Sequence, residues 1–577
     1  MKFTSLFFGL VLLMVPGAVR PAEVSSDAAF EQLAGRYVED YLVRHPEQAT
    51  SLGDHRFDNR LDDYSAAGRK RELADARKTL KELGRISPER LNRQNAADFA
   101  ILGDHLEAAI LEMGTIRSFE WNPMAYNAAN SIYLLLAREY APLPDRLRAV
   151  EGRLRGISNV VAAARANLRN PPRLHTETAI QQNQGSIHLV GEELNAFIVQ
   201  ASPGMRSNLV AAQSGAVQAL REYGRWLEKD LLPRSKGDFR YGDKKFRARL
   251  RYSLGSALSK EEILRNAEAD LAKTQGEMYE TARELHRKFF PAATAEASDP
   301  AARKQIIKHV LDQLAERHPA DATIVEQARR DLQECAQFVQ ERKIVSIPAE
   351  PLQVIVMPEF QRGVAVAYCD APGALARNEA TFFAIAPTPS DWTPRRKESF
   401  YREYNDYMLK NLTVHEAMPG HYLQLIHANG FQAPTKIRAL FPSGIFAEGW
   451  ATYTEQVMAS MGFGGPEVKM QQLKMRLRLI INAIIDQKIH TAGMTEKEAM
   501  ALMMEEGFQE EGEAAGKWKR ACLTATQLST YFVGNLEVNA LAEARKGSHP
   551  GESMMDRHDK IISFGSVAPK YLRALIE

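Results

Sequence analysis

Residues 415–421 read His-Glu-Ala-Met-Pro-Gly-His, and they set two imidazoles that can bind a metal around a carboxylate that can act as a base. A second carboxylate, Glu448, follows about 30 residues later in the sequence Ala-Glu-Gly-Trp. Two histidines and a downstream glutamate are the protein ligands of one class of catalytic zinc site, in which the fourth position stays open for water. The stretch therefore predicts one zinc ion per chain, held by His415, His421 and Glu448.

The spacing of the two histidines departs from the familiar zinc-peptidase helix, in which they stand four residues apart. His415 and His421 stand six apart, and on a regular helix six steps of about 100° would turn the two side chains ~240° away from each other. Pro419 disfavours a helical conformation of the residue before it and removes a backbone donor, and Gly420 tolerates unusual dihedral angles. We therefore predict a break or bulge at residues 418–420 that returns His421 to the side of His415.

Two further carboxylates complete the predicted site. Glu416 directly follows the first histidine, as in the familiar motif, and is the predicted general base, which takes a proton from the attacking water and passes it to the leaving amine. Glu455 stands seven residues after Glu448 on the same helix face and is expected to orient a ligating histidine. An alternative stays open for Glu448, because the helix dipole also favours a carboxylate at the start of a helix. His427 is interpreted as structural.

The chain on both sides of this stretch has the periodicity of helices. Apolar residues recur at three- and four-residue spacing, with charges between them, in segments such as 144–168, 207–232, 260–288 and 323–342. Ser259, followed by Lys-Glu-Glu, predicts a helix that starts at residue 260. Beyond residue 396 the same pattern predicts a helix that carries the motif, a helix from residue 445 and a long helix over 468–490.

A short β region stands directly before the motif. Residues 352–357, 364–368 and 381–386 read as strands. A sheet edge beside the metal would hold a peptide by main-chain hydrogen bonds, and a purely structural sheet is the open alternative. We predict a mainly α fold, with a large helical body around a deep cleft and one small β-sheet next to the motif helix. We expect an N-terminal helical region, 23–345, and a catalytic region, 346–577, or one continuous domain.

The start of the chain has a different composition. A secretory signal peptide typically has a basic start, an apolar run and small residues after it, and residues 1–22 follow this pattern with Lys2, the run over 3–15 and the residues at 16–18. The apolar run is too short to span a bilayer. A buried N-terminal helix is the alternative. No cysteine lies nearby, so we expect a periplasmic or secreted protein without a lipid anchor and without stable membrane insertion. The formal net charge of +2 gives no case for nucleic acid as a partner.

These motifs together resemble a known family. The chain resembles the bacterial domain-of-unknown-function 885 family, whose mark is His-Glu-x-x-Pro-Gly-His-x-x-Gln, here residues 415–424. The match extends to residues 448–455, to Asp486 with His490, and to residues 527–534, and upstream to 121–123 and 162–172. The resemblance implies a helical zinc peptidase of the type with two histidines and a glutamate, gluzincin-like and distantly similar to the thermolysin, oligopeptidase and angiotensin-converting-enzyme group.

The resemblance also implies roles for single residues. It supports the three metal ligands and the base named above, and it implies that the hydroxyl of Tyr531 stabilises the oxyanion of the tetrahedral intermediate. An ordinary interface tyrosine stays open for Tyr531. His490 is either a second electrophile or a group that supports the ligands, and a capping histidine near a helix end is equally open. The family's arginine after an Asp-Ser pair is missing from 370–373, where Arg377 follows four residues later, so binding of a substrate carboxylate could differ.

The expected activity is that of a zinc-dependent peptidase. A helical shell around the cleft restricts entry, so the expected substrates are short peptides, by analogy with the fold. Two alternatives stay open: a zinc amidase or esterase that acts on a non-peptide substrate, and a non-catalytic helical binding protein with a vestigial motif. The sequence does not choose between trimming a peptide from one end and cutting it internally.

Overall fold

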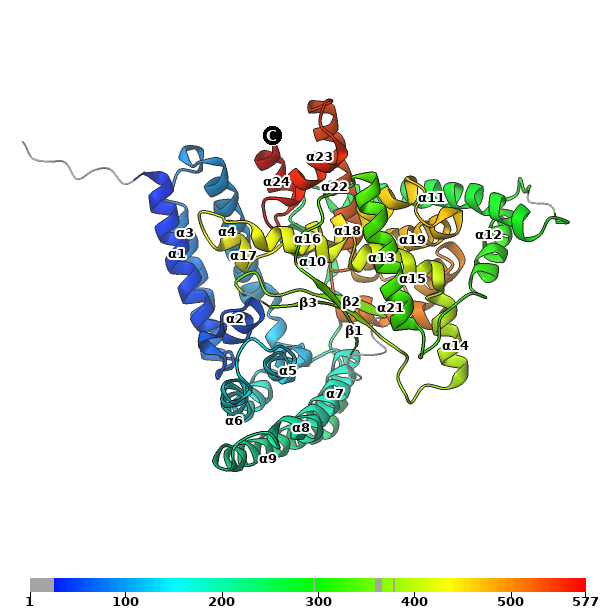
Figure 1. The fold of residues 1–577 in the computed structure, drawn as a ribbon. Helices are drawn as coiled ribbons and strands as arrows, with labels where there is room; N and C mark the ends of the chain where they lie inside the picture. Colours follow the sequence, from blue (N-terminus) through cyan, green and yellow to red (C-terminus); the bar gives the residue numbers. More distant parts are fainter. Residues whose placement is uncertain (1–24, 294–295, 358–365, 377–378) are drawn as a thin grey trace, which may run out of the picture.

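The computed structural model describes residues 25–293, 296–357, 366–376 and 379–577, and it shows a mainly α fold with one three-stranded sheet (Figure 1). The predicted fold class is confirmed. The helices before the sheet are α1 (Ser26–Arg44), α2 (Pro46–Leu52), α3 (Ala66–Leu83), α4 (Arg93–Leu111), α5 (Ala129–Ala137), α6 (Leu143–Asn167), α7 (Arg173–His188), α8 (Asn195–Ile198), α9 (Pro203–Trp226), α10 (Gly242–Leu254), α11 (Lys260–Phe289), α12 (Pro300–Leu314) and α13 (Ile324–Arg342).

The helices after the sheet carry the motif and enclose it. They are α14 (Pro394–Glu403), α15 (Asp406–Glu416), α16 (His421–Gly430), α17 (Ile437–Leu440), α18 (Gly444–Ser460), α19 (Gly465–Ala492), α20 (Glu496–Ala501), α21 (Glu511–Leu523), α22 (Ser529–Ser548), α23 (Met554–Ile562) and α24 (Pro569–Ile576). None of the described helices is long and apolar enough to cross a bilayer.

The helix starts and ends follow the local signals in the sequence. The predicted helix at 260–288 is α11, and Ser259 caps it: the Glu262 amide donates to the Ser259 hydroxyl over 3.2 Å, and the Ser259 amide donates to the Glu262 carboxylate over 2.8 Å. This reciprocal pair satisfies two amide groups that a helix start leaves without partners. The predicted long helix over 468–490 is α19, which is two to three residues longer at each end.

The small sheet has mixed strand directions. Its strands are β1 (Leu352–Val356), β2 (Ala367–Asp370) and β3 (Thr381–Ile385), in the order β1-β3-β2. β1 runs parallel to β3 and β2 antiparallel to it. The first and third predicted strands are confirmed. The second is predicted at 364–368, of which 364–365 lie outside the described residues, and the strand that is seen continues to Asp370.

One hydrophobic core joins the start of the chain to the motif region. It contains Phe30 of α1, Phe383 of β3, Leu409 of α15 and Trp450 of α18, all fully buried. A second core lies among α5, α6, α7 and α9, and in Figure 1 helices α6 to α9 lie at the lower edge, below the sheet. The first core contains residues from both sides of position 345, and the division of the chain there stays a prediction.

Candidate metal centre

The motif does not form one helix. α15 ends at Glu416 and α16 begins at His421, so the predicted break at 418–420 is confirmed. The Met418–Pro419 peptide bond is cis. The break also requires a glycine: a Cβ added to Gly420 would lie 1.8 Å from the carbonyl oxygen of His415, far inside the contact distance of two atoms. Proline and glycine together therefore let the chain turn between the two histidines.

Two hydrogen bonds fix the turn. The amide of Gly420 donates to the carbonyl of Val414 over 2.9 Å, which ties the turn to the last part of α15. The indole N–H of Trp450 donates to the carbonyl of Pro419 over 2.8 Å. Trp450 is fully buried and belongs to α18, which also carries Glu448. One residue of the Ala-Glu-Gly-Trp sequence thus holds the turn, and another faces the histidines that the turn positions.

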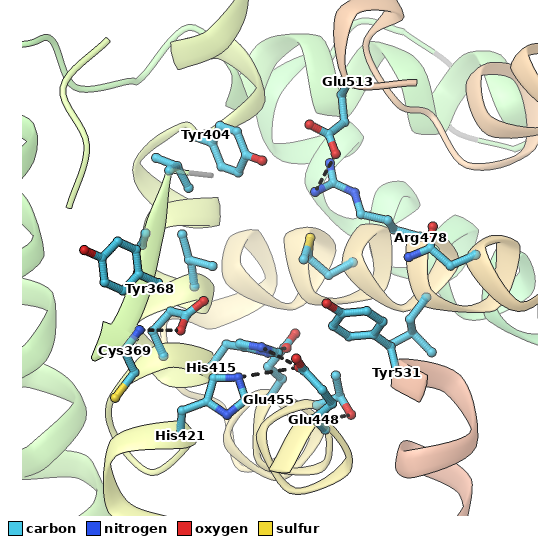
Figure 2. Close-up of a pocket in the computed structure, with 18 of the residues that line it drawn as sticks. Tyr368, Cys369, Tyr404, His415, His421, Glu448, Glu455, Arg478, Glu513 and Tyr531 are labelled. Carbon is cyan, nitrogen blue, oxygen red and sulfur yellow. Dashed lines mark hydrogen bonds and ion pairs between the residues drawn. The ribbon is translucent and has the colours of Figure 1, made fainter. Parts of the chain in front are cut away.

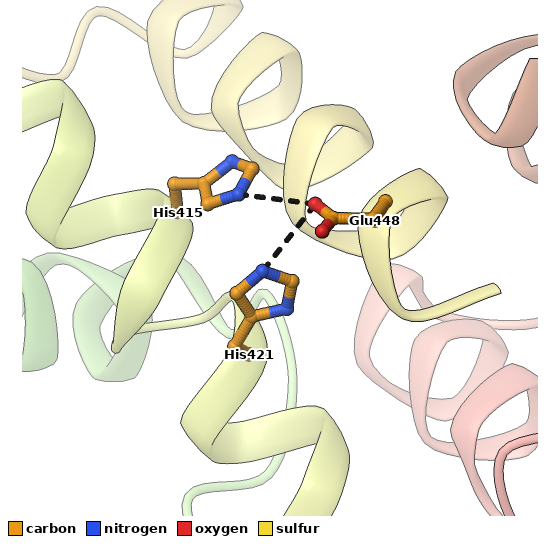
Figure 3. Close-up of side chains that lie close together, drawn as sticks. All are labelled: His415, His421 and Glu448. Carbon is orange, nitrogen blue, oxygen red and sulfur yellow. Dashed lines mark ion pairs between the residues drawn. The ribbon is translucent and has the colours of Figure 1, made fainter. Parts of the chain in front are cut away.

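The turn brings the three predicted ligands together. Nε2 of His415 lies 3.4 Å from Oε2 of Glu448, and Nε2 of His421 lies 3.5 Å from the same oxygen (Figure 3). The two imidazole rings are 4.7 Å apart between centroids and nearly perpendicular. One ligand atom from each residue lies within 4.8 Å of the others.

This donor set fits a zinc ion. Oε2 of Glu448 is buried and has no hydrogen-bond partner among the described residues, and its two contacts with imidazole nitrogens align as ion pairs rather than as hydrogen bonds. A buried oxygen without a partner is costly, and a cation between it and the two nitrogens would satisfy all three atoms. Burial acts to raise the pKa of Glu448, but the imidazoles of His421 and His415 outweigh it and hold that pKa well below its usual range.

Glu455 lies where the sequence predicts it. Its Oε1 is 2.6 Å from Nδ1 of His415, and its Oε2 accepts a hydrogen bond of 2.8 Å from the side-chain amide of Asn411. The carboxylate is buried and lies at the Nδ1 side of the ring, so Nδ1 of His415 donates to it and Nε2, which faces Glu448, is the nitrogen left to bind a metal. α15 and α18 therefore fix the tautomer of the first histidine.

The predicted base is held by the sheet. The amide N–H of Cys369 in β2 donates to Oε2 of Glu416 over 3.0 Å, at the end of α15. Burial raises the pKa of Glu416, while the nearby imidazoles of His421 and His415 act in the opposite direction. The sheet that precedes the motif thus contacts the site through the backbone of its strand β2.

The three predicted ligands line one cavity of about 370 Å³ together with Glu416, Glu455 and Cys369 (Figure 2). β2 bounds this cavity on one side, and α19, α21 and α22 bound it on the other. The cavity is also lined by Tyr531, whose ring points into it from α22. The Tyr531 hydroxyl accepts a hydrogen bond of 3.0 Å from the guanidinium of Arg520. The remaining lining residues that carry charge are Arg478, Glu513 and Lys517.

The position of Tyr531 follows from two close contacts. α18 and α22 cross at Gly449 and Gly534, where a Cβ on Gly449 would lie 2.4 Å from the carbonyl oxygen of Gly534. Asp486 of α19 fixes the start of α22, because its carboxylate accepts from the amide N–H groups of Thr526 and Ser529, each over 3.0 Å. The helix that carries Tyr531 is therefore held against the helix that carries Glu448.

The other predicted residues have different surroundings. His490 does not line the cavity: its Nε2 donates to the carbonyls of Ala521 and Thr524 at the end of α21, over 2.9 and 2.7 Å, and its ring stacks on Phe246. His490 therefore caps the end of α21 and not the end of its own helix, and these contacts do not favour the electrophile role. His427 donates to the carbonyl of Ser346, a structural contact. Arg377 lies outside the described residues.

The sequence does not predict the cations of the cavity. Glu513, Lys517 and Arg520 stand four and three residues apart on α21, a spacing that places them on one helix face. That spacing was a signal for a common surface, but only the fold shows that the surface faces the metal ligands.

The family of the chain follows from a match along almost its whole length. Residues 46–576 match the family described as bacterial protein of unknown function (DUF885). The chain belongs to the DUF885 family. A search of the curated proteins finds no significant match to this DUF885 chain.

Two solved structures share the fold of this DUF885 protein. A "putative lipoprotein of unknown function" from Shewanella oneidensis is 31% identical, with a TM-score of 0.80 over 95% of this chain and 99% of that chain. A "putative lipoprotein" from Colwellia psychrerythraea is 17% identical, with a TM-score of 0.77 over 96% of this chain and 99% of that chain. An M32 carboxypeptidase from Deinococcus radiodurans R1 aligns at 10% identity over 88% of this chain and 95% of that chain, with a TM-score of 0.29, which is too low to indicate a shared fold.

These comparisons correct the predicted location. The sequence predicts a free periplasmic or secreted protein without a lipid anchor, and that prediction is wrong, because both similar structures are described as a "putative lipoprotein". The prediction rested on the absence of a cysteine near the apolar run at the start, and such an absence carries no information about an anchor. The predicted signal peptide, 1–22, lies outside the described residues.

Proposed function

We propose that this DUF885 protein is a zinc-dependent peptidase that hydrolyses short peptides. One observation carries the proposal: two imidazole nitrogens face one buried carboxylate oxygen of Glu448 that has no hydrogen-bond partner among the described residues. A second carboxylate, that of Glu416, lines the same cavity. Three protein ligands with a neighbouring base are the parts that metal-assisted hydrolysis needs.

A zinc ion at this centre would polarise a water molecule and the carbonyl of the scissile bond. The residues of the chain supply the rest. Glu416 takes the proton from the water and gives it to the leaving amine. Glu455 holds His415 in the tautomer that a metal ligand needs. Tyr531 lines the cavity and is assigned the stabilisation of the oxyanion, with Arg520 as the donor to its hydroxyl.

The position of the sheet favours a peptide over a non-peptide substrate. Within the described residues β2 lies at an edge of the sheet, and Ala367, Tyr368 and Cys369 line the cavity. An extended peptide pairs with such a strand by main-chain hydrogen bonds, which an ester or a simple amide does not offer. A cavity of about 370 Å³ stands near the small end of the ~300–1,000 Å³ range of ligand pockets, which suits short substrates.

The test joins metal analysis with a digest of a peptide library, read by mass spectrometry. We expect about one zinc per chain and cleavage of short peptides by the zinc-loaded protein. Glu416→Gln should keep the zinc and lose at least ~100-fold in turnover, since general-base catalysis contributes about 10²–10⁴-fold. Glu505→Gln, at an exposed carboxylate, is the matched control. Full activity of Glu416→Gln would remove Glu416 as the base.

A second result separates the enzyme from a binding protein with a vestigial motif. His421→Ala should lose zinc, because it removes one of three ligands. A purified wild-type chain without stoichiometric zinc, with stability unchanged by a chelator, would overturn the proposal. If the protein binds zinc and hydrolyses simple amides or esters but no peptide, the metal centre is supported and the proposed substrate class is wrong.

A further inference from the structure

The wall of the cavity away from the metal centre is cationic. Arg478 of α19 and Lys517 and Arg520 of α21 line it, together with the carboxylate of Glu513. Figure 2 shows Arg478 and Glu513 across the cavity from the two histidines, with Tyr531 between the two ends. A substrate that reaches the metal centre therefore also faces this wall.

The carboxylates near this wall do not balance its cations. Glu403 is used by two of them: its Oε2 pairs with Lys474 over 2.7 Å, and its Oε1 pairs with Arg478. Glu513 is shared, because its Oε1 lies 3.7 Å from both Arg478 and Lys517, beyond the length of a hydrogen bond. This wall and the layer behind it thus contain four cations, with Arg520 as the fourth, and two carboxylates, and the Lys474–Glu403 pair lies behind the lining residues.

The excess positive charge lies on Lys517 and Arg520. The guanidinium of Arg520 donates to two neutral acceptors, Oε1 of Gln527 over 2.9 Å and the hydroxyl of Tyr531 over 3.0 Å, and forms no ion pair with any described carboxylate. Burial lowers the pKa of Lys517 to about 8; the charge of Glu513 acts against this, and the charges of Arg478 and Arg520 act in the same direction as burial. Both groups would be stabilised by an anion in the cavity.

We infer that Lys517 and Arg520 bind the C-terminal carboxylate of the peptide substrate, so that the protein removes residues from the C-terminus. The inference rests on the proposed peptidase function. The two side chains stand three residues apart on α21 and face the same cavity. A guanidinium forms bidentate hydrogen bonds with a carboxylate, and an ammonium adds a point charge.

The size of the cavity places the cleaved bond near that end of the peptide. One wall holds the carboxylate and the opposite wall holds the metal ligands, within a cavity of about 370 Å³. Hydrolysis breaks the C–N bond of the peptide between these walls. The hydroxyl of the water joins the acyl carbon, and its proton goes to the amine of the released C-terminal fragment, whose carboxylate Lys517 and Arg520 hold.

Three peptides test the inference on the zinc-loaded protein. They are N-acetyl-trialanine as the free acid, the same peptide as its C-terminal amide, and N-acetyl-Ala-Ala-Glu as its amide, which carries a carboxylate only on a side chain. Wild-type protein should cleave the free acid with a kcat/KM roughly 10- to 100-fold above that of either amide, the effect of one charge-assisted hydrogen bond. Equal rates for the free acid and both amides would overturn the inference.

Substitutions test which residues cause the preference for the free acid. Lys517→Met and Arg520→Met should each remove most of the ~10- to 100-fold advantage of the free acid, mainly through KM. The quantity compared is the ratio of kcat/KM for the free acid to that for the amide within each variant, because Arg520→Met also removes the donor to the Tyr531 hydroxyl. Arg520→Lys should restore part of it, because it keeps the charge. Lys519→Met is the matched control, since this lysine of α21 is outside the cavity and donates to Gln181 over 3.1 Å. A preference that survives both methionine variants contradicts the assignment.

A binding measurement separates this inference from the proposed function. Calorimetry on Glu416→Gln, which should not turn over, compares the free acid with its amide. The free acid should bind ~10-fold or more tightly than the amide, and this difference should be lost in the double variant Glu416→Gln with Arg520→Met. Such a result supports the carboxylate subsite even if the wild-type protein cleaves no peptide, in which case only the peptidase proposal fails. Equal affinity for the acid and the amide overturns the subsite whatever the activity.

Discussion

The indole N–H of Trp450 donates a 2.8 Å hydrogen bond to the carbonyl oxygen of Pro419. This bond joins two helices that each supply one residue of the candidate metal centre, because α18 carries Glu448 and the turn at Pro419 sets the start of α16 at His421. The relative position of the two ligands therefore depends on a single buried side chain as well as on the turn itself.

Replacing Trp450 with phenylalanine should damage both stability and metal binding. The ring keeps most of its packing, but the Pro419 carbonyl loses its donor in a buried place, which costs about 1–3 kcal/mol of the free energy of unfolding. Zinc affinity should fall as well, since the start of α16 loses its anchor. Urea unfolding and competition with a chelator for zinc measure the two effects. Trp392→Phe, at a partly exposed tryptophan, should change neither. Wild-type stability and wild-type zinc affinity in Trp450→Phe would mean that the turn does not depend on this hydrogen bond.

Gly420→Ala tests whether the turn tolerates a side chain. The new Cβ would lie 1.8 Å from the carbonyl oxygen of His415, so backbone must move at a metal ligand. We expect a loss of at least ~2 kcal/mol of unfolding free energy and a zinc affinity reduced by ~10-fold or more. Gly430→Ala, at the exposed end of α16, meets nothing within 4 Å and is the matched control. Equal zinc affinities of the two variants would contradict the account of the turn.

The turn itself could be predicted because its causes are local. Proline restricts the residue before it, and glycine tolerates close backbone approach, whatever the rest of the fold does. The contact of Glu455 with His415 could be predicted for the same reason, since helix periodicity places positions 448 and 455 on one face. The capping pair of Ser259 and Glu262 is a third local feature that the sequence carries by itself.

The rest of the site depends on contacts between segments distant in the chain. Arg520 and Tyr531 meet only because Asp486 holds the start of α22, and no local pattern indicates this. His490 shows the same limit: its position near the end of α19 suggested a cap for its own helix, but its ring binds carbonyls of α21 instead. Tertiary packing therefore determines which side chains form the far wall of the cavity.

A buried histidine near the site should make stability depend on pH. His558 accepts from the Tyr453 hydroxyl over 2.9 Å and donates to the carbonyl of Ile344 over 2.8 Å, and burial lowers its pKa to about 4. In the unfolded chain a histidine has a pKa of about 6.5. Between these values the unfolded chain binds a proton that the folded protein does not, so the free energy of unfolding falls as pH falls from about 6.5 to about 4.

The expected size of this loss is ~2–3 kcal/mol. It is measured by urea unfolding of the metal-free protein at pH 7.5 and at pH 4.5, in the wild type and in His558→Gln. The variant should be less stable at pH 7.5 but should lose less than the wild type on acidification. His549→Gln, at an exposed histidine, should follow the wild type. A variant with the full pH dependence of the wild type would remove His558 as its source.

The contact between Glu455 and His415 should be visible in metal affinity and not only in stability. Glu455→Gln keeps the shape of the side chain, but its NH2 group cannot accept the 2.8 Å hydrogen bond that Oε2 of Glu455 accepts from Asn411. The substitution also removes the negative charge that strengthens the 2.6 Å hydrogen bond from Nδ1 of His415. His415 then becomes a weaker and less well oriented ligand, and the zinc Kd should rise ~10- to 100-fold. Titration of zinc against a chelator of known affinity measures it, with the exposed carboxylate variant Glu543→Gln as control. If Glu455→Gln were less stable by unfolding yet bound zinc with wild-type affinity, the carboxylate would support the packing of α15 against α18 and not the ligand itself.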